Sequence, residues 1–186
     1  MAFAAKSARK PKTLDPPALF EYAVRSLASQ MRTVANLKRM LRRRVEPGEP
    51  GEAAVEAVLL KLRQLNYLND TRFAADYTRL RMENEKFGRR RVQQDLMQRG
   101  VPSPLIATTL AAAYDDKDEL TLCRRYIERK RMKQPTEQKE TTRIVGRLLR
   151  AGFSTGIIYK ALRNWNIPEE SLEGLDTADD ENPAFE

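Results

Sequence analysis

Four acidic side chains lie within five positions of the sequence, and carboxylates are the usual protein ligands of Mg²⁺. They are Asp115, Asp116, Asp118 and Glu119. Such a cluster would suit a nuclease-like active site, in which a metal ion activates water for attack on a phosphodiester. The same residues stand where a helix is expected to begin, and negative charge stabilises the N-terminus of a helix. We interpret the cluster as a helix start and predict that the protein is not an enzyme.

The chain lacks the residues that other common catalytic and metal-binding sites require. The chain contains no histidine, which removes the commonest general base and the commonest metal ligand. Its single cysteine, Cys123, cannot form an internal disulfide or a structural zinc site, and we interpret it as a small buried hydrophobe. No Gly-x-x-x-x-Gly-Lys segment is present to bind a nucleotide phosphate. We therefore predict neither a metal nor another cofactor.

Basic side chains form three dense clusters, and such clusters suit binding to a polyanion. The first comprises Lys38, Arg39, Arg42, Arg43 and Arg44, and the second comprises Arg89, Arg90 and Arg91. The third comprises Arg129, Lys130, Arg131 and Lys133, and it comes shortly after Arg124 and Arg125 in the sequence. Two clusters fall at related positions of the repeat described below, which favours one shared basic face over separately solvated helices. The strongest candidates for contact are Arg43, Arg44, Arg89 and Arg90. Arg91 is weaker, since it adjoins the inward Val92 and is expected to pair internally.

The charge of the chain is unevenly distributed. The net charge is +8, yet eight acidic residues and no basic ones follow Asn164. Without those eight, 18 acidic residues face 34 basic ones, a net charge of +16. So basic a body should attract nucleic acid or another polyanion. We interpret the acidic segment as a solvated, disordered end. The alternative, that it folds back as a mimic of the polyanion, stays open.

A repeat organises the chain and positions these clusters. Residues 92–110 match residues 144–162 at a constant offset of 52, with apolar residues on apolar residues and Gly100 on Gly152. A third copy lies upstream, where Leu37 and Leu41 correspond to Val92 and Leu96 at an offset of 55. Long repeats of this kind indicate an array of one supersecondary unit. Modular helical arrays mostly bind other macromolecules.

Helix signals divide each copy into three helices. Asp15 is expected to cap the first helix, followed by two prolines in its first turn. Asn69-Asp70 and Ser103 are expected to cap later helices, whereas residues 46–51, rich in Pro and Gly, predict a loop before a helix from about Glu52. The sequence thus predicts an all-α fold of three tandem three-helix repeats forming an elongated, curved array. The predicted divisions are a disordered basic arm 1–14, repeats 15–68, 69–114 and 115–166, and a disordered acidic tail 167–186.

Two segments resemble the RecX family, the bacterial regulators of the RecA recombinase. Residues 67–74, Tyr-Leu-Asn-Asp-Thr-Arg-Phe-Ala, resemble the family's Leu-x-Asp-x-x-Phe-Ala segment. Residues 87–92, Phe-Gly-Arg-Arg-Arg-Val, with Leu96 and then Arg-Gly-Val at 99–101, resemble Gly-x-x-Arg-Ile followed by Leu-x-x-Lys-Gly-Ile. The resemblance covers about residues 17–165. The long loop of the first repeat and both tails depart from it, so no function of the tails is implied.

The resemblance implies a partner and a mechanism. Proteins similar to this one bind along the groove of the RecA filament on single-stranded DNA. There they limit filament growth or promote disassembly, which lowers strand exchange, ATP hydrolysis and assisted repressor cleavage in the SOS response. We therefore expect a cytoplasmic monomer, without a membrane segment, that regulates homologous recombination and DNA repair. Two alternatives rest on the residues alone: a DNA-binding protein that acts without RecA, and a helical scaffold for another partner.

Overall fold

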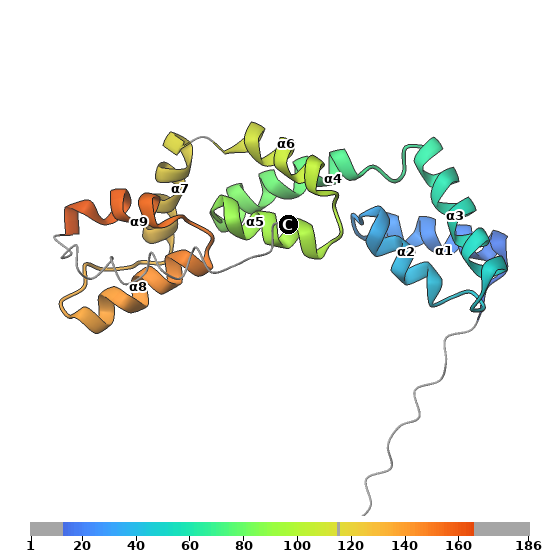
Figure 1. The fold of residues 1–186 in the computed structure, drawn as a ribbon, viewed down its shortest axis with the longest axis horizontal. Coiled ribbons are helices and arrows are strands. Elements are labelled where there is room, and N and C mark those ends of the chain that lie inside the picture. The colour runs from blue at the N-terminus through green and yellow to red at the C-terminus, as the bar shows by residue number, and fades with distance from the viewer. Residues whose placement is uncertain (1–12, 115, 166–186) are drawn as a thin grey trace, which may run out of the picture. The chain divides into compact units, whose positions relative to one another are not determined.

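Helices make up the regular structure of residues 13–114 and 116–165, which this computed structural model describes (Figure 1). Over these residues nine α-helices follow in three trios: α1 (Pro16–Ser29), α2 (Val34–Arg42), α3 (Glu49–Gln64), α4 (Asp70–Leu80), α5 (Arg89–Gln98), α6 (Ser103–Ala113), α7 (Asp116–Arg129), α8 (Gln138–Arg150) and α9 (Thr155–Leu162). A π-helical turn, η1 (Arg81–Glu85), follows α4, and a 3₁₀ turn, η2 (Arg163–Trp165), follows α9. The predicted class, all-α with three-helix repeats, is confirmed. The predicted arm, up to residue 12, and the predicted tail lie outside the described residues.

The chain packs as two compact units. The first spans Met1–Phe73 with Arg99–Val101, and the second spans Ala74–Gln98 with Pro102–Glu186. The core of the first unit includes Leu19, Leu37, Leu41, Val55 and Leu62, all fully buried. The core of the second includes Val92, Leu96, Leu110, Phe153 and Ile158. Leu37 and Leu41 of the first core and all five named residues of the second are positions that the repeat aligns. No helix in the described ranges is long and apolar enough to cross a membrane.

Several helix ends form as the sequence predicts. The Asp15 carboxylate accepts a hydrogen bond from the Ala18 N–H at 2.9 Å and caps α1. Asn69 caps α4 in the same way, accepting from the Arg72 N–H at 2.9 Å. Each cap pairs an N–H group that the first turn of a helix leaves without a partner.

Two helix starts differ from the prediction. Helix α3 begins at Glu49 rather than near Glu52, so Pro50 and Gly51 lie within its first turn. Proline is tolerated there because a first-turn residue needs no intrahelical N–H bond. Gly51 fits because a Cβ atom at this position would lie 2.0 Å from the Glu46 carbonyl oxygen. Helix α6 begins at Ser103 itself, and no side chain caps it.

The N-terminus of α5 is joined to the C-terminal end of α8 inside the second unit. The Gly88 N–H donates to the Ala151 carbonyl oxygen at 2.9 Å. Glu119 of α7 adds a second bond, since its carboxylate accepts from the Arg89 N–H at 3.0 Å. Unpaired N–H groups of one helix thus meet unpaired carbonyl groups of another and a carboxylate, an arrangement that both helix dipoles favour.

Two glycines allow this close contact. A Cβ atom on Gly88 would lie 2.4 Å from the Gly152 carbonyl oxygen, and one on Gly152 would lie 2.2 Å from the Arg91 backbone nitrogen. Gly152 also has a φ of +92°, which residues with a side chain rarely adopt. Gly152, the predicted end of α8, is therefore also the residue against which the N-terminus of α5 packs.

The first unit contains a joint of the same kind. Thr33, the N-cap of α2, donates its hydroxyl to the Arg99 carbonyl oxygen at 2.6 Å. The Asp70 carboxylate accepts from the Val34 N–H at 2.9 Å. Gly100 follows with a φ of +76°, the left-handed conformation that the repeat predicts for a helix-ending glycine. In both units, therefore, the start of one middle helix is hydrogen-bonded to the end of the middle helix of the next repeat.

Candidate basic interaction surfaces

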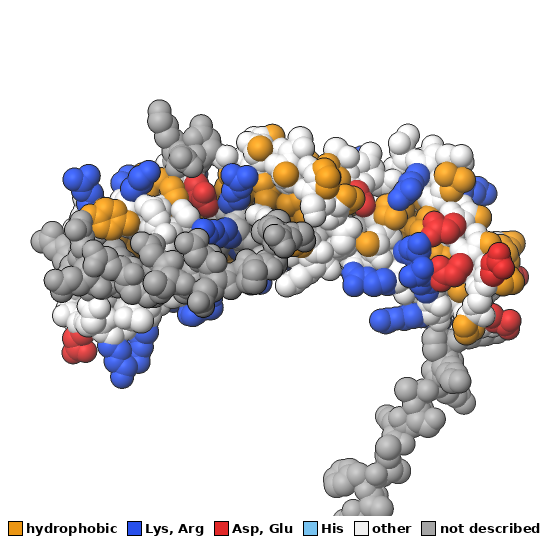
Figure 2. Space-filling model, viewed as in Figure 1, with side chains coloured by type: hydrophobic (Ala, Val, Ile, Leu, Met, Phe, Trp, Pro, Cys, Tyr) orange, Lys and Arg blue, Asp and Glu red, His pale blue; other side chains and the backbone are white. Residues whose placement is uncertain are grey.

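Two members of the first basic cluster, both on α2, pair with acidic residues of α3. Lys38 forms an ion pair with Glu56. Arg42 donates from Nε and Nη2 to one Glu52 oxygen at 3.0 and 2.7 Å. This hydrogen bond raises the pKa of Arg42 and lowers the pKa of Glu52. Basic and acidic side chains accordingly lie next to one another over α2 and α3 in Figure 2.

The remaining members of this cluster differ in their surroundings. The Arg44 guanidinium lies 4.8 Å from the centre of the Tyr22 ring, a cation–π contact. Arg39 donates a hydrogen bond to the side chain of Asn36. Arg43 is exposed and forms no ion pair or hydrogen bond with another side chain in the described ranges. Arg43 is therefore the member of the cluster best placed to meet an outside partner.

In the second cluster, Arg91 belongs to an internal network centred on Asp95. Asp95 is 8% exposed and lies 3.4 Å from Arg91 Nε and 3.6 Å from Arg81 Nε. It also accepts the Tyr77 hydroxyl at 2.9 Å. The Arg91 guanidinium stands 5.7 Å from the centre of the Phe87 ring. The expectation that Arg91 pairs internally is confirmed.

Arg89 and Arg90 point their side chains outward, while the Arg89 N–H donates to Glu119 of α7 and the Arg90 N–H to the Gly152 carbonyl oxygen after α8. Both are exposed. Arg89 lines one side of a groove of about 340 Å³ over α5 and α6, whose apolar part includes Met97 and Ile106.

The third cluster lies at and beyond the C-terminus of α7. Arg129 pairs with Glu85 of η1 at 3.8 Å. Lys130 Nζ lies 5.7 Å from the centre of the Tyr126 ring. Arg131 and Lys133 are exposed. The second unit thus contains the second and third clusters, and the first unit contains the first.

The structure reveals a fourth set of cations, which the search for runs of basic residues missed. We call it the α8 stripe, and its members, all exposed, are Lys139, Arg143, Arg147 and Arg150. They recur every three or four residues, which places them along one side of a helix. Val145 and Leu148 recur on the buried side. Helical periodicity, rather than adjacency in the sequence, is the signal that finds such a stripe.

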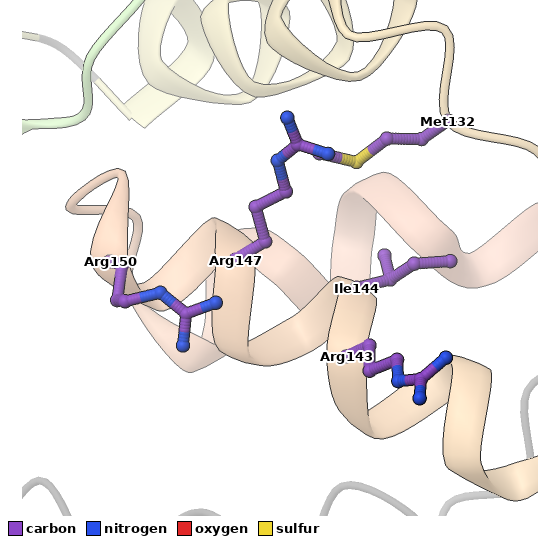
Figure 3. A pocket seen from close by; sticks show the side chains of 5 residues that line it. All are labelled: Met132, Arg143, Ile144, Arg147 and Arg150. Carbon is purple, nitrogen blue, oxygen red and sulfur yellow. The ribbon is translucent and has the colours of Figure 1, made fainter.

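The three arginines of the α8 stripe line a shallow pocket of about 460 Å³ (Figure 3). Met132, from the segment after α7, and Ile144 complete the lining. Arg147 extends toward Met132, and the other two arginines flank it along the helix.

None of these arginines forms an ion pair or a hydrogen bond with an acidic side chain among the described residues. The closest acid along the helix, Glu140, has its carboxylate engaged by Thr136. The Thr136 N–H donates to it at 3.0 Å and the hydroxyl at 3.2 Å. These bonds lower the pKa of Glu140, the Thr136 N–H contributing most, and the charge of Arg143 adds a smaller effect in the same direction. The stripe therefore offers guanidinium groups that form no ion pair with another described side chain, and only the charge of Arg143 acts on a described carboxylate, that of Glu140.

The acidic cluster has a structural role that differs in part from the prediction. Helix α7 does begin at Asp116, as expected for a helix start. Glu119, however, is buried, and its carboxylate accepts a hydrogen bond at the N-terminus of α5. Residue 115 and the side chains of 116–118 lie outside the described residues. Within the described ranges no group of three potential ligand residues could hold a metal ion.

Cys123 is fully buried, which confirms its interpretation as a small hydrophobe. Burial, with a smaller contribution from the charge of Glu119, raises the pKa of its thiol to about 12. The positive charge of Arg124 opposes this shift without reversing it. The thiol is therefore protonated at neutral pH and unreactive.

The fold and these surfaces define the class of the protein, an all-helical array of three-helix repeats with cationic surfaces. Residues 69–110 match a family described as RecX, second three-helix domain. The regulatory protein RecX of Trichlorobacter lovleyi is 31% identical over 147 residues, which cover 77% of this chain and 93% of that protein. The chain belongs to the RecX family of regulatory proteins.

Further similarities cover most of the chain. The regulatory protein RecX of Deinococcus radiodurans is 32% identical over 163 residues, covering 83% of this chain and 72% of that one. The crystal structure of RecX from Lactobacillus salivarius aligns with a TM-score of 0.67 at 22% identity. That alignment covers 81% of this chain and 96% of the other, and it shows a shared fold.

Proposed function

We propose that this protein binds the RecA filament on single-stranded DNA and limits its strand exchange, ATP hydrolysis and assisted repressor cleavage. It acts as a non-catalytic, cytoplasmic monomer and thereby regulates recombination and DNA repair. The observation that carries the proposal is membership of a family of regulatory proteins, supported over three quarters or more of the chain.

The electrostatics of the protein support a filament of protein and DNA as the partner. Outward cations such as Arg43, Arg89 and Lys133 are available for contact. A filament that contains DNA presents phosphates to such groups, and their neutralisation releases counterions. Binding should therefore weaken steeply as salt rises.

The test is the single-strand-dependent ATPase activity of RecA, with this protein titrated at ratios far below one per RecA. Inhibition at such ratios is expected, because a protein that acts on filaments influences many RecA subunits from one site. Loss of ATPase activity only near one-for-one coverage would contradict the proposal.

Replacing Arg42, Arg43 and Arg44 together by Glu is expected to weaken filament binding without unfolding the protein. The structure offers a cleaner variant, since Arg42 is paired with Glu52 and Arg44 contacts the Tyr22 ring, whereas Arg43 has no partner among the described side chains. Arg43→Glu should raise the concentration needed for half-inhibition several-fold. Arg63→Glu, an equal charge change at an exposed site of α3, is the control. Equal inhibition by Arg43→Glu and the parent would remove this surface from the proposal.

A second candidate function is DNA binding without RecA, which the net charge of +16 over residues 1–163 favours. In that case inhibition appears only when the protein covers the DNA, and added DNA relieves it. A helical scaffold for another partner would have no effect on RecA at any ratio.

A further inference from the structure

The α8 stripe and the C-terminal segment of the chain carry opposite charge in unusual concentration. The stripe holds three arginines that form no ion pair with a described acidic residue, around one pocket (Figure 3). The segment after Asn164 holds eight acidic residues and no basic ones. Both belong to the same chain, so any attraction between them needs no second molecule.

The described chain ends at the segment after α7, one residue of which lines the pocket. The last described residue is Trp165, whose carbonyl oxygen accepts a hydrogen bond from Gln134 Nε2 at 3.0 Å. Gln134 stands two residues after Met132, which lines the pocket. The last described residue is therefore held by the same segment after α7 that contributes Met132 to the pocket. An extended chain as long as residues 166–186 reaches roughly 70 Å.

From this complementarity we propose that the acidic segment 169–186 binds the α8 stripe within the same molecule and occupies it as an internal competitor of external polyanions. Carboxylates of the segment pair with Arg143, Arg147 and Arg150. The proposal does not depend on RecA, because it concerns the protein by itself.

Tethering makes the segment an effective competitor even if each ion pair is weak. A short flexible linker gives an effective concentration on the order of 1 mM. If the free segment bound with a Kd of about 0.1 mM, tethering would lower the apparent affinity of the stripe for an external polyanion about tenfold. Arginine pairs with carboxylates through two parallel hydrogen bonds, which favours an acidic peptide as the occupant.

A spin label on the segment of the full-length protein measures this contact directly. Ala178→Cys supplies the labelling site, and buried Cys123, with its thiol pKa raised to about 12, stays unlabelled at neutral pH. The label broadens the NMR signals of nearby backbone amides. We expect loss of amide intensity over residues 143–150 at low salt. Intensity should return when the ionic strength rises from about 0.01 M to about 1 M, because the screening length falls from roughly 30 to roughly 3 Å.

Matched variants locate the contact on the stripe. The triple replacement Arg143→Glu, Arg147→Glu and Arg150→Glu should abolish the loss of intensity over α8. The control makes the same charge change at exposed residues of the first unit, Arg25→Glu, Arg43→Glu and Arg63→Glu, and should leave the loss unchanged. Broadening of α8 that survives the first triple replacement, or that is absent from the parent at low salt, would overturn the proposal.

A mixed sample separates internal from intermolecular binding. Unlabelled ¹⁵N protein is combined with spin-labelled ¹⁴N protein, so that only contacts between molecules broaden signals. Unbroadened α8 signals are expected in the mixture, whereas broadening there would assign the occupant to a second copy and overturn an internal contact.

A binding measurement supplies the functional counterpart. In a variant whose eight acidic residues after Asn164 become the corresponding amides, affinity for oligo(dT) should rise about tenfold at low salt. The same amide changes combined with the Arg143, Arg147 and Arg150 replacements should give no such rise. An equal rise in both backgrounds would mean that the segment acts through net charge alone, which would overturn a defined site.

Discussion

Helices α5 and α8 stand at the same place in successive repeats and both are rich in arginine, but their arginines have different surroundings. In α5, Asp95 is buried and holds Arg91 and Arg81 within 3.6 Å. The corresponding position of α8, 52 residues later, is Arg147, which is exposed. The presence of Asp95 in α5 thus pairs its neighbouring arginines within the fold, whereas the arginines of α8, which has Arg147 at that position, remain available to a ligand.

Helix α2 illustrates a third arrangement, in which the neutralising acids come from the following helix. Glu52 and Glu56 of α3 pair with Arg42 and Lys38. A count of basic residues would rank the first cluster, with five members, above the α8 stripe, with four, whereas the distribution of acidic partners reverses the order. The difference shows that a run of basic residues forms a surface for a ligand only where acidic side chains do not already pair with them.

The largest expected effect is at the joint between the two compared helices. Gly152→Val should destabilise the protein by about 3 kcal/mol or more, because the new side chain meets the Arg91 backbone and φ is unfavourable. Urea unfolding followed by circular dichroism measures the loss. Gly156→Ala is the control, since a Cβ at this position of α9 meets no atom within 4 Å. It should stabilise the protein by about 0.5–1 kcal/mol. Similar losses from both variants would contradict the role given to the joint.

A smaller effect separates the corresponding residues of α5 and α8. Asp95→Ala should cost about 2 kcal/mol, because the Tyr77 hydroxyl and two guanidinium groups lose their buried acceptor. Arg147→Ala should change the free energy of unfolding by less than about 0.5 kcal/mol, as for most exposed residues. Chemical denaturation of the two variants side by side tests the contrast. If Arg147→Ala proves as costly as Asp95→Ala, the α8 stripe is part of the fold rather than a free surface.

The smallest effect concerns how the two helices begin. Glu119→Gln should destabilise the protein by about 0.5–1 kcal/mol, because it removes a charge that faces the N-terminus of α5. Glu137 precedes α8 but makes no capping bond with its side chain. Glu137→Gln is therefore expected to be neutral within about 0.3 kcal/mol in thermal unfolding. A larger loss from Glu137→Gln would show that α8, too, depends on an acidic cap.

Local features of the fold followed from the sequence. Caps such as Asp15 and Asn69, and the stops at Gly100 and Gly152, form between residues close together in the chain, where residue type nearly determines geometry. The start of α3 was wrong because composition alone does not distinguish a Pro-Gly loop from a Pro-Gly first turn. The π-turn η1 after α4 was not predicted, since no residue of the Arg81–Glu85 run demands it.

The candidate site was predictable only where a contact is local. The pairing of Arg91 was anticipated from its neighbour Val92, and its partner lies one turn away at Asp95. The pairing of Arg42 with Glu52 and the binding of Glu119 to α5 were missed, because they join different helices. The α8 stripe was missed for a different reason, since its signal is periodic and a search for consecutive basic residues does not detect it.

The joint between α5 and α8 also orders events during synthesis. The N–H groups at the start of α5 acquire their carbonyl partners only when the end of α8 has been made, about 60 residues later. At roughly 5–20 residues per second, the ribosome needs about 3 to 12 s to supply that stretch. The N-terminus of α5 therefore stays without these carbonyl partners until the last trio has been synthesised, and the second unit can complete its packing only then.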